Sequence, residues 1–358
     1  MNMNEKKRTE HALCFVPEML VDYLNKSNIK ILQPASFFLH GVCLLVDISG
    51  FTKLSGQFCD QGKAGIDDLQ LATNGFMGQL VDIIYTFGGD IIKFAGDAII
   101  CVFTADFVPS TSNKPVRRSS MGSFATGMNE FMKNLAKNIE TTSVEYSVSV
   151  NTRSSISPEV VLRVMHCAKL LTEVQTDKLT VHVAMSCGEM CFGILGGFEN
   201  RWECLISGPC IHQLSGCLDD APSKHAVMSR RCARIVREEL PTDKNKPFEA
   251  IVSELETSRG TYSFTLLPLV SGNCEIVAVT FTEQKTSRAV SVKETMRFEF
   301  RDSERNALIQ PFVPVPIAEQ LDNGTGLHFL AEIREVTTMF MKVISWFSYF
   351  LALLFKTI

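Results

Sequence analysis

Residues 41–47 read GVCLLVD, a continuous apolar run that ends in a carboxylate. This pattern predicts a β-strand that is buried on both faces. The stretch SGFT at 49–52 breaks the strand, and residues 76–87 then carry apolar side chains at helical spacing. Two short apolar runs follow at 90–94 and 98–103, separated by a glycine-containing turn that is typical of a hairpin. The order strand, helix, strand, strand therefore begins the domain.

Further strands and helices are predicted after a long polar stretch. We expect a helix over 160–171, strands over 179–186 and 190–195 joined across Cys187-Gly188-Glu189, a strand over 204–206, a helix over 211–218, a strand over 226–228 and a helix to Leu240 with Ser229 as its cap. Two interleaved strand-helix-strand units over one sheet indicate an α+β fold of ferredoxin-like arrangement, with a mixed sheet and packed helices, spanning 38–240.

Three further segments surround or interrupt this domain. Residues 1–37 form an N-terminal lead-in. Residues 109–158 are rich in Ser, Thr and Asn, and we expect a flexible insertion there. Residues 241–310 alternate apolar and polar positions over part of their length, which predicts a β-rich linker region with a small fold of its own.

Composition excludes some function classes. The 35 basic and 39 acidic residues leave a net charge of -4, so no positive field gathers nucleic acid. The 12 cysteines show no paired CxxC spacing of a zinc site, and several lie in apolar runs. Reduced thiols used as small buried side chains are the favoured interpretation, which places the protein in the cytoplasm. The N-terminus has no apolar stretch of signal-peptide length.

The C-terminal tail, 343–358, begins with the uncharged run VISWFSYFLALLF at 343–355. This run is shorter than the roughly 20 residues that cross a bilayer, so a core or interface segment is favoured. Membrane association through the tail is the alternative.

Two carboxylates occupy strand ends beside glycine turns. Asp47 ends the first strand, and Asp97 lies in the hairpin turn. If the strand lies beside the hairpin, both side chains reach one end of the sheet, where a pair of carboxylates can hold Mg²⁺ and leave its other positions to water and phosphates. The turn into the next helix offers backbone amides to an anion, from Ser49, Gly50, Phe51 and Thr52. Taken alone, a strand-end Asp is more often a turn former or cap.

The motif LLVDISGFTKL at 44–54, followed by FGGDIIKFAGDAII at 87–100, resembles the class III nucleotidyl cyclases. The likeness is greatest to the first catalytic half of the bicarbonate-responsive soluble adenylyl cyclases, and it covers about 38–240. The resemblance implies a cyclase catalytic domain that converts ATP to cyclic AMP and pyrophosphate. It also implies two Mg²⁺ ions, which Mn²⁺ can replace, held by Asp47, Asp97 and the backbone carbonyl of Ile48. Lys93 and Arg201 match the family's bicarbonate pocket.

The sequence also departs from that family. Active sites in the family form between two cyclase halves, and the second half supplies an Asn and an Arg to the reacting phosphate. His212 and Gly216 stand at those places here, so turnover is expected to need a second cyclase domain in cis or in trans. Residues 311–342 resemble the start of that second half, which favours a truncated product over a genuine short form. The alternative is a non-catalytic nucleotide-binding, regulatory or scaffold protein with the cyclase fold.

Overall fold

The computed structural model of the chain describes residues 12–26, 29–104, 156–237, 249–283 and 307–322. The chain divides into two compact units, and every described residue belongs to the first, Met1–Asn113 with Ser154–Ala331. Nearly all of the predicted 109–158 insertion and the whole 343–358 tail lie outside the described residues.

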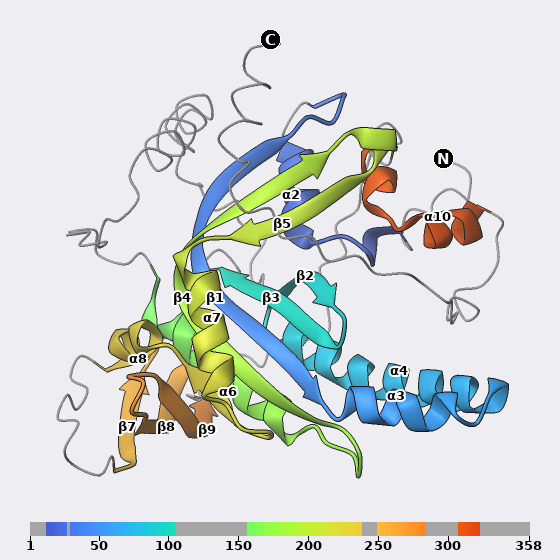
Figure 1. Cartoon of the computed structure of the whole chain (residues 1–358). Helices are drawn as coiled ribbons and strands as arrows, with labels where there is room; N and C mark the ends of the chain where they lie inside the picture. Colours follow the sequence, from blue (N-terminus) through green and yellow to red (C-terminus); the bar gives the residue numbers. More distant parts are fainter. Residues whose placement is uncertain (1–11, 27–28, 105–155, 238–248, 284–306, 323–358) are drawn as a thin grey trace, which may run out of the picture. The chain divides into compact units, whose positions relative to one another are not determined.

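A nine-stranded sheet forms the framework of the first unit (Figure 1). Its strand order is β2-β3-β1-β4-β6-β9-β8-β7, and β5 pairs with β4. In chain order the strands are β1 (Ala35–Ser49), β2 (Asp90–Ala95), β3 (Ala98–Thr104), β4 (Thr180–Gly196), β5 (Trp202–Ser207), β6 (Ala226–Met228), β7 (Ile251–Glu256), β8 (Gly260–Pro268) and β9 (Cys274–Glu283).

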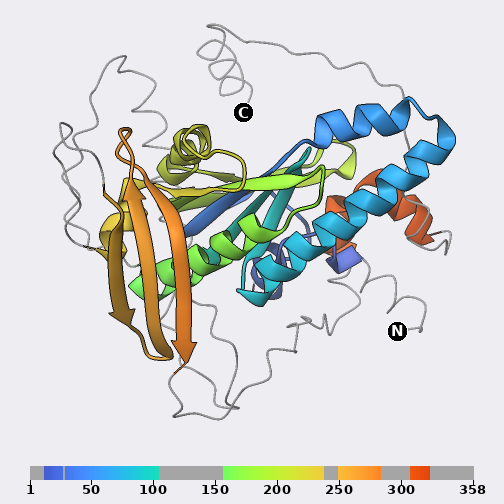
Figure 2. The same cartoon turned by 90° about the horizontal axis from the view of Figure 1, so that it is seen from below.

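Helices cover both faces of this sheet. The described helices are α2 (Glu18–Lys26), α3 (Phe51–Cys59), α4 (Lys63–Thr86), α6 (Pro158–Glu173), η1 (Phe198–Asn200), α7 (Pro209–Asp219), α8 (Arg230–Val236), η2 (Gln310–Phe312) and α10 (Val315–Asp322). One apolar core contains side chains of α4, α6 and α8, and a second core contains side chains of α2 and α7. Figure 2 shows α4 and α6 together on one face of the sheet.

The central strands have the predicted ferredoxin-like connectivity. β1 pairs antiparallel with β3 and with β4, β2 pairs antiparallel with β3, and the α3–α4 and α6 segments are the crossovers. Along β1, Val42 and Leu44 enter one core and Cys43 enters the other, and all three are 0% exposed. The prediction of a strand buried on both faces is therefore confirmed.

One strand replaces the two that were predicted over 179–195. β4 runs without a turn through Gly188, which pairs with Gly41 of β1. A Cβ atom on Gly41 would lie 2.5 Å from the carbonyl oxygen of Phe103, so glycine is needed there because another backbone approaches closely. At Gly188 a Cβ would lie 3.1 Å from a guanidinium nitrogen of Arg231. Close packing, and not chain reversal, accounts for these glycines.

The sheet continues past residue 240, where the sequence analysis ended the cyclase-like domain. β9 pairs antiparallel with β6, and buried side chains of β8, Tyr262, Phe264 and Leu266, belong to the same core as α6. The described part of the expected linker is thus continuous with the domain. The alternating pattern predicted strands, but it cannot show which sheet those strands extend.

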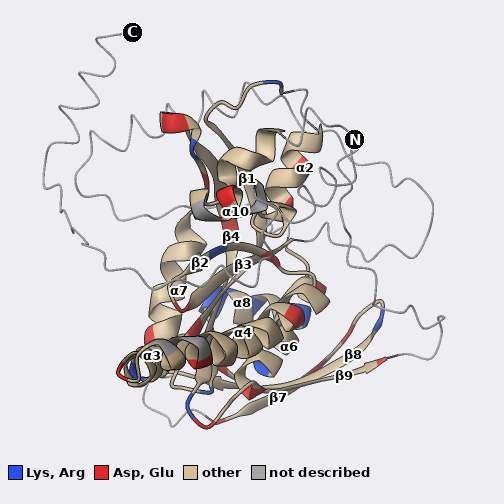
Figure 3. Ribbon diagram, turned by 90° about the vertical axis from the view of Figure 1, so that its right-hand side faces the viewer, with Lys and Arg blue, Asp and Glu red and all other residues tan. Residues whose placement is uncertain are grey.

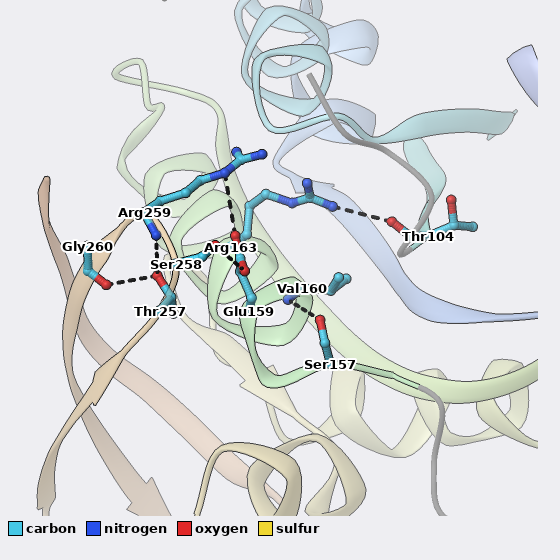
Figure 4. Close-up of polar contacts among 9 residues, drawn as sticks. All are labelled: Thr104, Ser157, Glu159, Val160, Arg163, Thr257, Ser258, Arg259 and Gly260. Carbon is cyan, nitrogen blue, oxygen red and sulfur yellow. Dashed lines mark hydrogen bonds and ion pairs between the residues drawn. The ribbon is translucent and has the colours of Figure 1, made fainter. Parts of the chain in front are cut away.

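Polar contacts also join this extension to α6 (Figure 4). Glu159 in the first turn of α6 forms an ion pair with Arg259 at 3.5 Å and accepts a hydrogen bond from the Ser258 hydroxyl at 3.1 Å. One turn later, Arg163 donates to the carbonyl of Thr104 at the end of β3, at 3.4 Å. The β7–β8 turn, α6 and β3 are therefore linked by side chains as well as by the core.

The two serines that precede helices behave differently. Ser157 accepts a hydrogen bond from the amide of Val160 and caps α6, with Pro158 at the first helical position. Ser229 precedes α8, but its hydroxyl makes no capping bond and donates to the Cys232 thiol at 3.5 Å. Ser229 is thus the N-cap residue of α8 as predicted, but its side chain adds no capping hydrogen bond.

The segment after the extension packs on the second core. Leu308, Ile309 and Val313 are buried there, and Phe312 lies 6.4 Å from Trp202 between ring centroids. Residues 311–322 of the predicted second-half start therefore belong to the first unit, and 323–342 lie outside the described residues.

The cysteines are mostly buried, as expected for thiols used as small apolar side chains. All twelve lie in the described ranges and form no disulfide, and all are buried except Cys14, Cys59 and Cys191. In the view of Figure 3, Lys and Arg positions and Asp and Glu positions are both scattered over the described elements. In the described part of the chain, no helix has both the length and the apolar character needed to cross a membrane.

Candidate active site

Strand register brings the two predicted carboxylate residues to one end of the sheet. Asp47 of β1 pairs with Ala98, the first residue of β3. Asp97 directly precedes Ala98 in the β2–β3 turn. Both aspartates are only partly buried, which leaves them accessible to a ligand.

The chain turns directly after Asp47 into α3. Gly50 has φ 94° and precedes the helix, and a Cβ there would lie 2.4 Å from the carbonyl oxygen of Lys178. Both the left-handed backbone and this close approach require glycine. Ser49 ends β1, and Phe51 and Thr52 begin the helix, so the predicted phosphate-binding amides lie at an N-terminus that follows the aspartate.

Asp47 has a partner that the sequence analysis did not identify. His182 of β4 is its register partner, and Nε2 of His182 lies 2.6 Å from Oδ2 of Asp47. Nδ1 of His182 lies 2.8 Å from the carbonyl oxygen of Ala221. Both ring nitrogens of His182 therefore lie within hydrogen-bond distance of an acceptor oxygen, one on the Asp47 carboxylate and one on the Ala221 carbonyl. The imidazole ring is held in place by one backbone contact and one carboxylate contact.

The site satisfies the minimum requirement of magnesium and no more. Within the described ranges, no three His, Cys, Asp or Glu side chains gather to hold a metal. Mg²⁺ needs only one or two carboxylates, because water and substrate phosphates fill its other positions. Asp47 and Asp97 provide two carboxylates at one end of the sheet, the number that such a site would need. The side chain of Ile48 has no atom that can bind a metal, so its backbone carbonyl is the one group of this residue that could act as a ligand, and the residue is 3% exposed.

The two cations of the predicted anion pocket, Lys93 and Arg201, pair with different carboxylates. Lys93 of β2 forms an ion pair with Glu203 of β5 at 2.8 Å. Arg201, between η1 and β5, lies 3.8 Å from Glu199. Each cation therefore has a glutamate of its own, and an anion between them would have to compete with these carboxylates.

The helix that would carry second-half donors lacks them. His212 and Gly216 are both exposed on α7. A Cβ on Gly216 would meet no atom within 4 Å, so the structure has space for a side chain that the sequence does not provide. The described chain therefore supplies carboxylates but no arginine at this position.

Comparison with known proteins shows sequence similarity to one kind of enzyme. Over 108 residues, 30% of this chain, the sequence is 29% identical to adenylate cyclase type 10 of Oryctolagus cuniculus. It is 28% identical over the same share to the adenylate cyclase type 10 of Rattus norvegicus and that of Homo sapiens. The match spans only 7% of the length of each relative. No protein-family model matches the chain.

Solved cyclase structures align over more of the chain but less closely. The guanylyl cyclase Cya2 aligns with 69% of this chain and 95% of its own, at 15% identity and a TM-score of 0.34. A bacterial light-regulated adenylyl cyclase aligns with 76% of this chain and 60% of its own, at 13% identity and a TM-score of 0.38. With TM-scores of 0.34 and 0.38, these alignments add nothing to the sequence similarity. The resemblance to soluble adenylyl cyclase rests on the sequence match and the motifs.

His182 shows what sequence reasoning missed. Its only local signal is a polar residue in the alternating strand TVHVAM at 180–185. Its position opposite Asp47 depends on the register of β1 and β4. His182 and Asp47 are 135 residues apart in the chain. A single sequence does not contain that register.

Proposed function

We propose that this chain is the metal- and nucleotide-binding half of an adenylyl cyclase, which converts ATP to cyclic AMP and pyrophosphate when a second cyclase half is present. The observation that carries the proposal is the register of Asp47 with Ala98, which brings Asp47 beside the turn that holds Asp97. The sequence match to adenylate cyclase type 10 supports the choice of reaction.

In this proposal Asp47, Asp97 and the carbonyl of Ile48 hold two Mg²⁺ ions, or Mn²⁺ in their place. The ions would neutralise the triphosphate and favour attack by the ribose hydroxyl. The chain's own groups orient the substrate. Amides at Ser49 to Thr52 face the phosphates at the start of α3, where the helix dipole favours negative charge. His182 fixes the Asp47 carboxylate through their 2.6 Å contact.

A second cyclase half would complete the site. On α7 the positions of the second-half Asn and Arg are taken by His212 and Gly216, so neither position offers an arginine to stabilise charge on the reacting phosphate. We therefore expect the chain alone to be inactive or weakly active. The base-selecting groups belong to the partner half, so the choice of ATP rests on the similarity to adenylate cyclase type 10.

Regulation by bicarbonate and location in the cytoplasm stay predictions. An anion at Lys93 and Arg201 would have to displace Glu203 and Glu199, each of which pairs with one of these cations. Membrane association through residues 343–355 is a prediction about residues outside the described ranges.

A second candidate is a nucleotide-binding scaffold without turnover. The observation that favours it is the 2.6 Å contact of His182 with Asp47, because the histidine occupies a carboxylate oxygen that a metal ion would need. The two candidates differ in product formation and agree on ATP binding.

The test combines the purified chain with a second cyclase half of adenylate cyclase type 10 and measures cyclic AMP formed from ATP and Mg²⁺. Asp47→Ala and Asp97→Ala should each lower turnover by about a thousandfold, since each removes a ligand of ions that contribute several kcal/mol. The matched control is Asp82→Ala, which removes an exposed carboxylate of α4 and should leave turnover unchanged. Circular dichroism confirms that each variant is folded.

Three outcomes decide between the candidates. Turnover that survives either active-site change contradicts the metal assignment. Mg²⁺-dependent ATP binding without product in any pairing favours the scaffold. Product from the wild-type pair, lost in both variants, supports the half-site enzyme.

A further inference from the structure

A second aspartate of the β2–β3 hairpin lies far from the proposed site and holds a helix. Asp90, the first residue of β2, accepts hydrogen bonds from the amides of Glu18 at 2.8 Å and Met19 at 2.9 Å. These amides belong to the first turn of α2, and the partners lie 72 and 71 residues apart in the chain. The carboxylate therefore caps α2 from outside and fixes it to the sheet.

Helix α2 also packs on the sheet through apolar side chains. Leu20 and Leu24 of α2 are 0% exposed in the second core, and the ring of Tyr23 stacks on Phe37 of β1 with centroids 5.7 Å apart. Asp90 itself is only 9% exposed beneath the helix. Docking of α2 thus buries a carboxyl group that water would otherwise solvate.

The surroundings of Asp90 are acidic or neutral. The charged side chains that act on it are the carboxylates of Glu18 and Asp22, both from α2. The other titratable groups around it are Tyr85 of α4, Cys101 of β3 and Cys204 of β5. Lys93, the cation of the same strand, is paired with Glu203. A negative charge on Asp90 is consequently buried near two like charges, and its compensation comes from two backbone amides.

We propose that Asp90 and α2 form a pH-responsive strap, in which proton uptake by Asp90 tightens the docking of α2 on the sheet and proton loss above neutral pH loosens it. The strap does not depend on the proposed function, because it uses no residue of the candidate active site. Proton uptake removes the unfavourable burial of a charge and its repulsion by Glu18 and Asp22, which outweighs the weaker hydrogen bonds that the neutral carboxyl group accepts from the two amides.

The direction follows from linkage. Burial, opposed by the two amide hydrogen bonds and reinforced by Glu18, raises the pKa of Asp90 from 3.8 to about 7. Release of α2 exposes the carboxyl group and returns its pKa toward the ordinary value, so the docked state binds the proton more tightly. The docking equilibrium constant should rise about tenfold from pH 8 to pH 6 and about another tenfold at pH 5.

The test is hydrogen exchange of α2 amides in the full chain from pH 5 to pH 8, corrected for the intrinsic effect of pH on exchange. Protection of residues 18–26 should increase about tenfold between pH 8 and pH 6, whereas α6 amides should not follow this curve. Asp90→Asn, a neutral side chain of the same shape, should abolish the dependence. Asp82→Asn on the exposed face of α4 is the matched control and should keep it.

Two results would overturn the strap. One is α2 protection that does not change with pH in the wild-type chain, and the other is a pH dependence that survives Asp90→Asn. If Asp90→Asn does not fold, the carboxyl carbon resonance of Asp90 in the wild-type chain decides. A midpoint near pH 7 that coincides with α2 protection supports the strap, and a midpoint near pH 4 refutes it.

Discussion

The two ends of strand β2 contain aspartates of opposite character. Asp90 at the start of the strand is 9% exposed and accepts a hydrogen bond from the amide of Glu18 in helix α2. These two residues are 72 positions apart in the chain. Asp97, just past the other end, lies partly exposed in a turn next to the register partner of Asp47. The residue type is the same and the chain separation is short. The packing of distant segments therefore decides which carboxylate stabilises the fold and which can meet a ligand.

Replacing each aspartate by alanine should separate these roles. Asp90→Ala leaves two amides of α2 without their acceptor, so the free energy of unfolding should fall by about 2 kcal/mol at pH 5.5. Asp97→Ala should change it by less than about 0.5 kcal/mol, because the turn is partly exposed. Urea unfolding at pH 5.5 measures both values.

The cost of Asp90→Ala should be smaller at pH 8 than at pH 5.5. The raised pKa of Asp90 contributes stability below about 7, and this contribution is lost as the pH rises through that value. Equal costs at the two pH values, or a larger cost for Asp97→Ala, would break the comparison.

A second change sharpens the active-site end. His182→Gln keeps a hydrogen-bond donor toward Asp47 and removes the imidazole, which carries a positive charge only when it is protonated. The Mg²⁺ concentration for half-maximal turnover of the paired enzyme should fall, by on the order of tenfold or less for a partly exposed charge. Magnesium titration of cyclic AMP formation measures this shift. An unchanged magnesium requirement would show that His182 does not compete with the metal, and Asp82→Asn serves as the charge-altering control.

The smallest expected effect concerns a histidine whose pH response opposes that of Asp90. His166 of α6 lies edge-on to Phe87 at 5.1 Å and to Tyr262 at 6.4 Å between ring centroids. Burial lowers the pKa of His166 from 6.5, and Glu173 opposes this shift. Below pH 6.5 the unfolded chain binds a proton that the folded chain resists, so stability falls with acidification.

His166→Phe should remove that loss and cost less than Asp90→Ala. The measurement is the difference in unfolding free energy between pH 7.5 and pH 5.5 in wild type and variant. A variant with an undiminished acid loss would assign the effect to another group.

Much of the site could be predicted because its residues lie in two short motifs. Asp47 with SGFT, and Asp97 in its glycine turn, follow from the local rules of strands, turns and helix starts, and the structure brings these motifs together as expected. His182 could not be predicted, since it depends on cross-strand register. The proximity of Lys93 to Glu203 likewise depends on the path of β5 past β2, which no local pattern contains.

Local periodicity and the glycine turns determined the elements of this protein. They predicted the βαββαβ order, the buried strand at 41–47, the hairpin and the two candidate carboxylates. Tertiary structure alone decided the partners: β4 as one strand, the extension of the sheet through β9, the histidine on Asp47 and the helix on Asp90. The physical reason is that propensity and hydrophobic period act between near neighbours in the chain. Register, burial and the sharing of hydrogen bonds are properties of segments that meet only when the whole core forms.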